Sequence, residues 1–301
     1  MNEQRARQAE DLIAETEDRI RRTQRAREAL LKLSSADSQP ELRSFDLRRR
    51  PAPYPAIELC ISHVDAWQPG GAKGLTVVAG EEGIGKSCLA LGAALTQAEL
   101  GIMSVVLDAE NDPALIMDRV AAFYGNQLEG FDRIMEAGLF HWLPIESGQS
   151  MREIARWISA HEDLRQCMVT SDSITTIARM VVSEPRFDVR GNVLPPKDEN
   201  YLVTCTKIAQ WMQSVSRRTR GEMRFLALAE MNKDRKVKGL ELGYIANVYI
   251  TLEREDENRP YLLRVRVRKN RSGPVDPVGR LYRFDHASLA FVPAKISETD
   301  E

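Results

Sequence analysis

The strongest constraint on the fold is the motif GEEGIGKS at residues 80–87. It follows a hydrophobic, β-like run at residues 75–79 (LTVVA) and precedes a segment rich in alanine and leucine. The motif fits the pattern G-x-x-x-x-G-K-[ST], whose glycine-rich loop carries a chain from a strand into a helix. Because the flanking segments have those two characters, the sequence predicts a phosphate cradle rather than an ordinary glycine-containing turn.

The residue types in this motif suit a nucleotide and its metal ion. Glycines allow backbone N–H groups to converge on phosphate oxygens, and the helix that begins near Lys86 adds the positive end of its dipole. The Lys86 ammonium can reach the β- and γ-phosphates, and the Ser87 hydroxyl can bind Mg²⁺. We therefore expect ATP and Mg²⁺ as cofactors, with the nucleotide contacted by Gly80, Glu81, Glu82, Gly83, Ile84, Gly85, Lys86, Ser87 and Cys88.

Two other β-like runs end in acids that could complete such a site. Asp172 closes the run CMVTSD and is the expected second Mg²⁺ ligand, the alternative being an aspartate in a surface turn. Glu110 follows the run SVVLD and is the candidate base for the attacking water, the alternative being helix capping. Carboxyl ends of parallel strands share one edge of a sheet, so these acids would lie near the cradle. Asp108 is expected to be structural.

The alternation of runs predicts an α/β fold. β-like runs at 75–79, 103–110, 167–172 and 225–230 are separated by segments of helical character, which predicts right-handed βαβ units and a mostly parallel sheet flanked by helices. The runs at 248–253 and 261–269 predict a C-terminal antiparallel extension. We expect this domain to span residues 57–301.

The N-terminal part differs in composition. Residues 1–33 are charged, contain no glycine or proline, and carry apolar residues at roughly helical spacing. They predict an N-terminal helical arm, either a short coiled coil for oligomerisation or partner docking, or a helix that packs on its own domain. Residues 34–56 mix serine, proline and charge, which is typical of a linker.

Composition limits the class of protein. The 301 residues carry a formal net charge of −2 and 43% hydrophobic residues, so any nucleic-acid surface must come from local clusters of basic residues. The four cysteines form no C-x-x-C pair, which favours reduced thiols over a zinc site. The start of the chain has no apolar core and no run approaches a membrane span, so we expect a cytoplasmic protein.

Taken in order, these motifs resemble the RecA-type ATPase core, especially the RadA and DnaB/RepA branch of hexameric motors. The segments that carry the resemblance are LTVVAGEEGIGKSCLAL, VVLDAENDPALIMDRVAAF, DSITTI, FLALAEMNK and VRVRKNRSGPVDPVGRLYRFD, within about residues 57–293. The resemblance implies a RecA-like sheet, ATP hydrolysis and a homo-oligomer, with a hexamer expected. It places Glu110 as the base and Asp172 as the Walker-B acid.

The resemblance also implies roles for three residues nearer the C-terminus. Lys269 and Arg271 match the fingers that reach a neighbouring subunit's nucleotide and stabilise charge on its γ-phosphate; the alternative is a basic edge strand that faces solvent. Glu230 occupies the γ-phosphate sensor position, where the relatives usually carry glutamine or histidine. A glutamate there would repel the phosphate unless it is protonated or paired, for example with Lys233.

Two segments are candidates for contact with DNA. Residues 183–200 form a long stretch without predicted secondary structure, and residues 232–239 (NKDRKVKG) carry four basic residues against one acid. The resemblance places DNA-gripping loops at both points, which would give salt-dependent binding to single-stranded DNA through phosphates. A solvated loop is the alternative. The candidate DNA-binding residues are Lys233, Arg235, Lys236 and Lys238.

Two functions fit these observations. The first is an oligomeric, Mg²⁺-dependent ATPase that couples hydrolysis to binding or movement on DNA in replication or recombination, with helicase activity within its range. The second is a P-loop ATPase switch that acts on protein partners through the N-terminal arm. GTP chemistry is not expected, because Arg235 stands where the guanine-reading N-K-x-D motif has aspartate.

Overall fold

The computed structural model describes residues 59, 61, 64–65, 74–145, 156, 167–183, 186–187, 193–194, 201–219, 222–231, 242–256, 258–285 and 288–294. By compactness the chain divides into two units, Met1–Ala52 and Pro53–Glu301, and the described residues belong to the second. The predicted helical arm and the predicted linker both lie outside the described residues.

A nine-stranded sheet forms the centre of this unit, in the order β11-β10-β9-β8-β1-β7-β4-β2-β3. The six strands from β8 to β3 in this order pair in parallel, whereas β8 with β9, β9 with β10 and β10 with β11 pair antiparallel. The strands are β1 (Leu75–Gly80), β2 (Met103–Asp108), β3 (Phe140–Pro144), β4 (Cys167–Asp172), β7 (Met223–Glu230), β8 (Val248–Asp256), β9 (Arg259–Asn270), β10 (Asp276–Asp285) and β11 (Ala290–Pro293).

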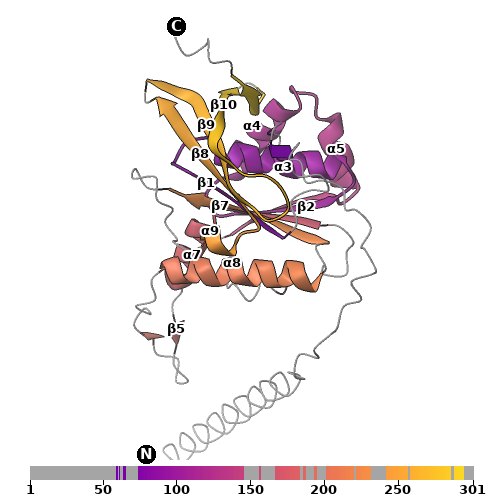
Figure 1. Cartoon of the computed structure of the whole chain (residues 1–301). Helices are drawn as coiled ribbons and strands as arrows, with labels where there is room; N and C mark the ends of the chain where they lie inside the picture. The colour runs from indigo at the N-terminus through magenta and orange to yellow at the C-terminus, as the bar shows by residue number, and fades with distance from the viewer. Residues whose placement is uncertain are drawn as a thin grey trace, which may run out of the picture. The chain divides into compact units, whose positions relative to one another are not determined.

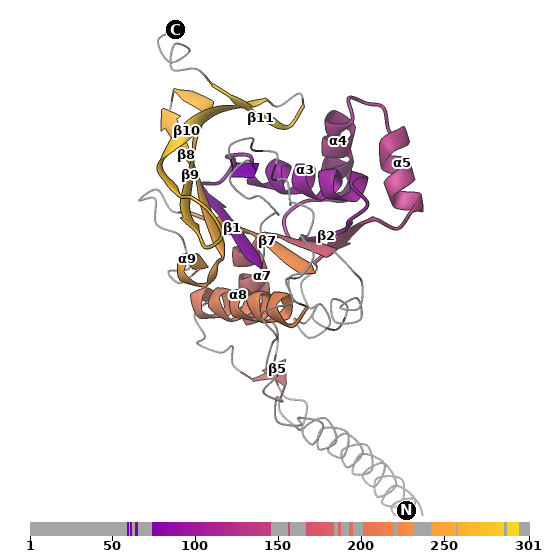
Figure 2. The same ribbon diagram turned by 45° about the vertical axis from the view of Figure 1, so that its right-hand side comes forward.

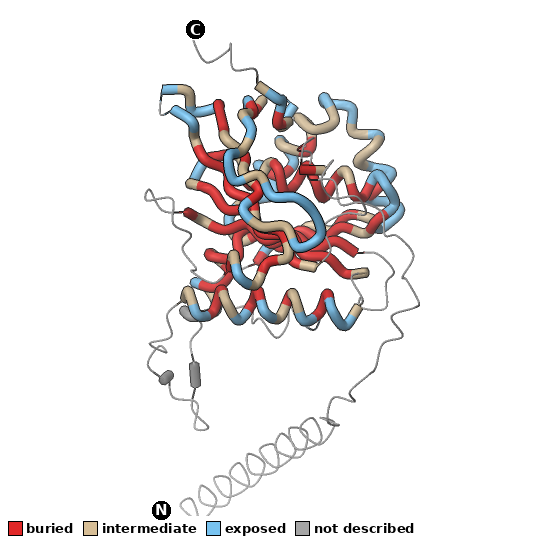
Figure 3. Tube along the Cα trace, in the orientation of Figure 1, coloured by how far each residue is buried: buried red, intermediate tan, exposed pale blue. Residues whose placement is uncertain are grey.

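Helices cover both faces of the parallel part (Figure 1; Figure 2). One face packs against α3 (Lys86–Glu99), α4 (Pro113–Phe123) and α5 (Glu129–Glu136), and the other against α7 (Ile174–Ser183), α8 (Tyr201–Arg218) and α9 (Leu242–Ile245). Strands β1 and β4 are buried along their whole length, whereas α8 alternates between buried and exposed positions (Figure 3). Two-sided burial explains why β1 (LTVVAG) reads as a nearly continuous apolar run, whereas β4 (CMVTSD) also buries polar residues.

Local signals account for the helix ends near the site. Asp112 caps α4 by accepting a hydrogen bond from the Leu115 N–H at 2.9 Å, and Pro113 follows it at the first helical position. Gly101, with φ of 80°, follows the C-terminal end of α3, where the left-handed region suits glycine. The predicted α/β fold with a C-terminal antiparallel extension is confirmed.

One detail of the extension differs from the prediction. Strand β8 pairs in parallel with β1, so the antiparallel part begins one strand later, at β9. Strand β9 lies between β8 and β10, but Lys269 and Arg271 follow Val267, the last residue of β9 that pairs with β10, so the alternative of a basic edge strand stays a prediction for them. Two arginines of β9 are paired: Arg266 and Arg268 both contact the buried Glu253 of β8, at 2.8 and 2.9 Å.

The remaining differences concern short segments. Helix α5 and strand β3 were not predicted, and the stretch 183–200 contains two short strands, β5 (Arg186–Phe187) and β6 (Val193–Leu194), which pair antiparallel. The prediction that this stretch lacks secondary structure is therefore wrong at those positions. Cys88, Cys167 and Cys205 are free thiols, the last two buried. In the described part of the chain, every helix is too short or too polar to cross a membrane.

Candidate functional site

The loop between β1 and α3 has the geometry of an anion cradle. Gly83 and Gly85 have φ of 69° and 92°, a region that glycine adopts without steric cost. A Cβ on Gly80 would lie 2.9 Å from the Ile84 side chain and 3.1 Å from the Leu252 carbonyl oxygen. No side chain caps the start of α3 at Gly85, so its first N–H groups are not used by a capping side chain. A phosphate is the kind of ligand that these groups bind.

Lys86, the first residue of α3, lies against this loop and is only 9% exposed. Its Nζ donates hydrogen bonds to the carbonyl oxygens of Gly80 and Glu81, at 3.0 and 2.6 Å. Burial lowers the pKa of Lys86, and the surrounding carboxylates oppose that shift. The acids whose charges act on the ammonium are Glu110, Asp172, Glu230 and Glu82. The structure thus places three of the predicted acids, from three different elements, around one lysine.

Asp172 ends β4 in a buried position beside Ser87. Burial raises its pKa to about 6, with Asp108 and Glu110 adding to the shift, while a hydrogen bond with Ser87 and the charge of Arg119 oppose it. A carboxylate that is costly to ionise in this way suits a bound cation. Among the described residues, no group of three histidine, cysteine, aspartate or glutamate side chains could hold a metal. Ser87 and Asp172 fit a Mg²⁺ site, because this ion is usually held by one or two protein groups and takes its other ligands from phosphates and water.

Glu110 lies just beyond the end of β2 and reaches across to the turn that follows β4. Its Oε1 accepts hydrogen bonds from Ser173 Oγ at 2.7 Å and from Thr176 Oγ1. These two hydroxyls fix the carboxylate at the edge of the sheet that holds the cradle. A fixed carboxylate beside the phosphates can orient and deprotonate a water molecule. The helix-capping alternative is wrong, because Asp112 is the residue that caps α4.

Asp108 has a different environment from its neighbours. It accepts hydrogen bonds from the Glu110 and Asn111 backbone N–H groups at 2.9 and 3.0 Å, and from Trp142 Nε1 at 3.1 Å. Asn111 Nδ2 bonds both Asp108 and Asp172, at 2.9 and 3.2 Å. These donors make Asp108 the anchor of the turn that carries Glu110, which agrees with the structural role expected for it.

Glu230 is the last residue of β7 and pairs in register with Gly80, the first residue of the cradle. Its carboxylate accepts a hydrogen bond from Arg179 Nη2 of α7 at 3.0 Å. The partner seen here is therefore Arg179, and Lys233, considered from the sequence, lies outside the described residues. The same is true of the other candidate DNA-binding residues, Arg235, Lys236 and Lys238.

Lys269 and Arg271 are not part of this cluster. Lys269 Nζ donates to the carbonyl oxygens of Gly243 and Tyr244 at 2.9 and 2.6 Å, and Arg271 Nη2 donates to Tyr244 O at 3.2 Å. By register, Lys269 is aligned through Tyr249 with Val77 of β1, three residues before Gly80. That places it two strand spacings (~10 Å) to the side of β1 and roughly 10 Å short of the cradle along the strand.

Two arginine positions near the cradle were missed by the sequence reasoning. Arg254 of β8 donates to the Glu82 carbonyl oxygen at 3.1 Å and lies 3.6 Å from the Glu81 carboxylate, so it holds the two glutamates of the loop. Arg179 was missed because a helix position gives no signal of a partner in another element. The hydroxyls of Ser173 and Thr176 lie in the stretch DSITTI, whose run of polar residues directly after a strand was the available signal.

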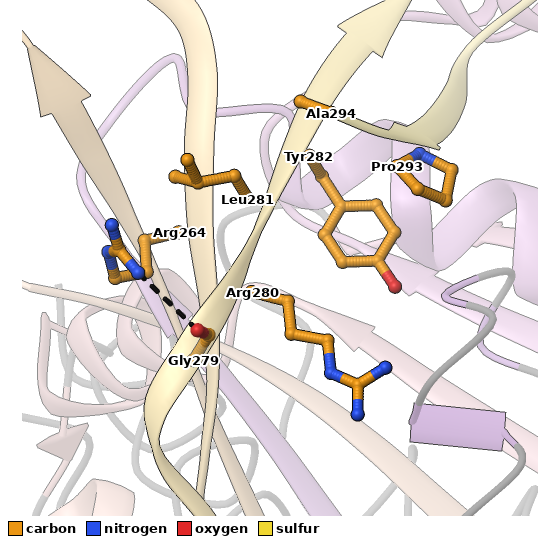
Figure 4. Close-up of a pocket in the computed structure, with 7 residues that line it drawn as sticks. All are labelled: Arg264, Gly279, Arg280, Leu281, Tyr282, Pro293 and Ala294. Atoms are coloured by element: carbon orange, nitrogen blue, oxygen red, sulfur yellow. Dashed lines mark hydrogen bonds between the residues drawn. The ribbon is translucent and has the colours of Figure 1, made fainter. Parts of the chain in front are cut away.

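A separate pocket lies in the C-terminal extension, between β9, β10 and β11 (Figure 4). It has a volume of about 380 Å³, and Arg280 and Tyr282 lie on the opposite side of β10 from Arg264 and Leu281. None of the cradle residues lines it. Further along β10, the ring of Phe284 lies against the cradle, 3.5 Å from where a Cβ on Gly85 would be.

Comparisons with known proteins identify the fold. Neither a protein-family model nor a curated protein sequence matches the chain. Among solved structures, the ATPase domain of G40P matches with a TM-score of 0.59 and 15% identity, over 89% of this chain and 98% of that one. A KaiC-like protein from Pyrococcus horikoshii OT3 matches with a TM-score of 0.58 and 18% identity, over 81% and 100%.

A third match is a DnaB-like replicative helicase, solved in a study of its interactions with primase. Its TM-score is 0.62 at 14% identity, over 94% of this chain and 75% of that one. At these identities the likeness concerns the fold. The chain therefore has the RecA-like fold that its sheet order indicates.

Proposed function

We propose that this protein is a Mg²⁺-dependent ATPase of the RecA and DnaB type that works as an oligomer on DNA. The observation that carries the proposal is the convergence of Lys86, Asp172 and Glu110 at the cradle edge of the sheet. A phosphate-binding loop, an acid for the metal and a fixed carboxylate for water are the parts that phosphoryl transfer to water requires.

Each of these residues has a defined task in the proposed reaction. The loop N–H groups and Lys86 would bind the phosphates, and Ser87 and Asp172 would hold Mg²⁺, which would supply positive charge to neutralise the phosphates. Glu110 orients the water and accepts its proton at a carboxylate oxygen; Ser173 and Thr176 hold that carboxylate in position. Arg254 keeps the Glu81 carboxylate engaged at the loop.

The position of Lys269 and Arg271 supports the proposal of an oligomer. Stabilising the charge that develops during transfer requires a cation near the transferred phosphate. Both residues lie to the side of β1 and short of their own cradle along the strand, so we propose that they serve the cradle of a neighbouring copy. Their hydrogen bonds to the carbonyl oxygens of α9 then preset their position within the extension.

The first test is ATP hydrolysis by the wild type and by Lys86→Ala, with and without single-stranded DNA, across a salt series. Lys207→Ala, an exposed lysine of α8, is the matched control. We expect hydrolysis that DNA stimulates, that salt weakens because phosphate contacts release counterions, and that only Lys86→Ala abolishes. Hydrolysis indifferent to DNA at low salt would instead favour a switch that acts on protein partners.

The second test addresses the shared site by complementation. Lys86→Ala lacks a working cradle but keeps its fingers, and Lys269→Ala/Arg271→Ala keeps its cradle but lacks fingers. Mixing the two inactive proteins should restore part of the hydrolysis, because some interfaces then join an intact cradle to intact fingers. If the mixture stays inactive while both variants still assemble, Lys269 and Arg271 do not act between subunits.

A further inference from the structure

The acid at the end of β7 poses a charge problem for a nucleotide site. Glu230 stands beside Gly80, and its charge acts on Lys86, the lysine that reaches the β- and γ-phosphates in loops of this kind. Its backbone is also tied to the site, since the Glu230 N–H lies 3.4 Å from Thr175 Oγ1. An ionised carboxylate this near would repel the last phosphate of a triphosphate more than it repels a diphosphate, because Coulomb repulsion falls with distance.

Arg179 is placed to cancel that charge. Its Nη2 lies 3.0 Å from Glu230 Oε2, and its guanidinium carbon lies 5.2 Å from the centre of the Tyr201 ring. Tyr201 is the first residue of α8, which packs against α7, so the guanidinium is held between the end of β7 and the start of a second helix. The cation–π contact favours one orientation of the guanidinium, which stays close to the carboxylate.

Fold stability alone gives little reason for this pair. The Arg179 side chain is 45% exposed and that of Glu230 is 21% exposed, and ion pairs with this much solvent access contribute little to the free energy of folding. The pair is nevertheless positioned by two other elements and faces the cradle edge of the sheet. A role in ligand binding explains the fixed position of this pair better than a role in folding.

We propose that Arg179 is a positioning residue that compensates the charge of Glu230, so that the site accepts a nucleoside triphosphate and distinguishes it from a diphosphate. This inference rests on the proposed function, because it requires a nucleotide in the cradle. With Arg179 present, the pair presents no net charge to the terminal phosphate and leaves other guanidinium N–H donors available to it. Without Arg179, the charge of Glu230 loses the cation that is paired with it here, and the carboxylate opposes the triphosphate selectively.

Equilibrium binding tests this with two ligands, ADP and a non-hydrolysed ATP analogue, each with Mg²⁺, measured by calorimetry. Arg179→Ala should weaken binding of the analogue about tenfold and binding of ADP less than twofold. Adding Glu230→Gln to Arg179→Ala should restore the analogue's affinity, because the double variant also lacks the carboxylate that repels the terminal phosphate. Arg133→Ala, which removes an exposed arginine paired with Glu99 of α3, is the matched control and should change neither affinity.

The outcomes separate the two proposals. Equal weakening of both ligands by Arg179→Ala, or a loss that Glu230→Gln does not rescue, would overturn the charge-compensation role while leaving nucleotide binding intact. Failure of the wild type to bind either ligand would instead refute the proposed function and this inference with it. If Arg179→Ala lowers the melting temperature too far for calorimetry, Arg179→Gln keeps part of the side chain with a neutral polar end and tests the same charge.

Discussion

Replacing Asp172 by asparagine should stabilise the protein in the absence of nucleotide and metal. Burial raises the pKa of this carboxyl to about 6 from its ordinary value of 3.8, so the folded chain pays to ionise it. The pKa of Asp172 is higher in the folded chain than in the unfolded one. The protein therefore has its full stability below about pH 4, where Asp172 is protonated in both states, and loses part of that stability as the pH rises through 6. Asparagine has no charge to bury and escapes that loss.

The size of the effect follows from the two pKa values. A shift of about two units at 1.36 kcal/mol per unit corresponds to roughly 3 kcal/mol at pH 8. The Asp172→Asn variant should regain less than this free energy of unfolding. In the wild type Asn111 Nδ2 donates a hydrogen bond to Asp172 Oδ2 at 3.2 Å, and a neutral amide accepts such a bond less strongly than a carboxylate does. We expect a net gain of about 2 kcal/mol, and a rise of roughly 4–8 °C in melting temperature for a domain of this size.

The assay is thermal unfolding in a metal chelator between about pH 4 and pH 8, with Asp118→Asn, an exposed aspartate of α4, as the control. The gain of Asp172→Asn should vanish near pH 4 and be complete above about pH 7. Adding Mg²⁺ and nucleotide should then raise the melting temperature of the wild type more than that of the variant. A destabilised variant at pH 8, or a gain that is independent of pH, would refute the reasoning.

Two other substitutions probe the supports of the site. Burial raises the pKa of Glu253, but its contacts with Arg268, Thr251 and Arg266 outweigh burial and hold that pKa below its usual range. Glu253→Gln should therefore cost about 2 kcal/mol of unfolding free energy in urea titrations near neutral pH, and the deficit should shrink below about pH 4 as the wild-type carboxyl is protonated. Gly85→Ala should cost about 1–2 kcal/mol, since φ is 92° there, and should weaken ADP binding in calorimetry; a variant with unchanged stability and affinity would contradict this account of the loop.

The parts of the fold that the sequence predicted are those with two independent signals. Strand β1 and helix α3 combine apolar runs with the glycine-lysine motif, and β4 combines a buried run with a terminal acid. The proximity of Glu110, Asp172 and Lys86 then followed from the rule that parallel strands end at one edge. Strand β3 (FHWLP) and the eight-residue helix α5 carry weak single signals, and both were missed.

The rest depended on information that lies outside any one segment. The alternation in RVRVR indicates a strand with one apolar face. The same pattern is expected for an edge strand whose arginines face solvent and for an interior strand whose arginines pair with acids of a neighbouring strand. Glu253 provides that acid from the neighbouring strand, so β9 is interior. Arg179 and Glu230 are likewise brought together only by the packing of α7 beside β7, which no local pattern encodes.

The sheet registers explain why binding and turnover should be separable in this protein. Gly80 pairs with Glu230, and Asp108 pairs with Asp172, so the cradle and its acids lie at the ends of neighbouring strands of one chain. Arg254, the cation of β8 nearest the loop, is already engaged with Glu81 and Glu82. Lys269 and Arg271 lie away from the cradle edge and must serve another copy if they act on a nucleotide. Nucleotide affinity should therefore be independent of protein concentration, whereas hydrolysis per subunit should rise as the chains assemble.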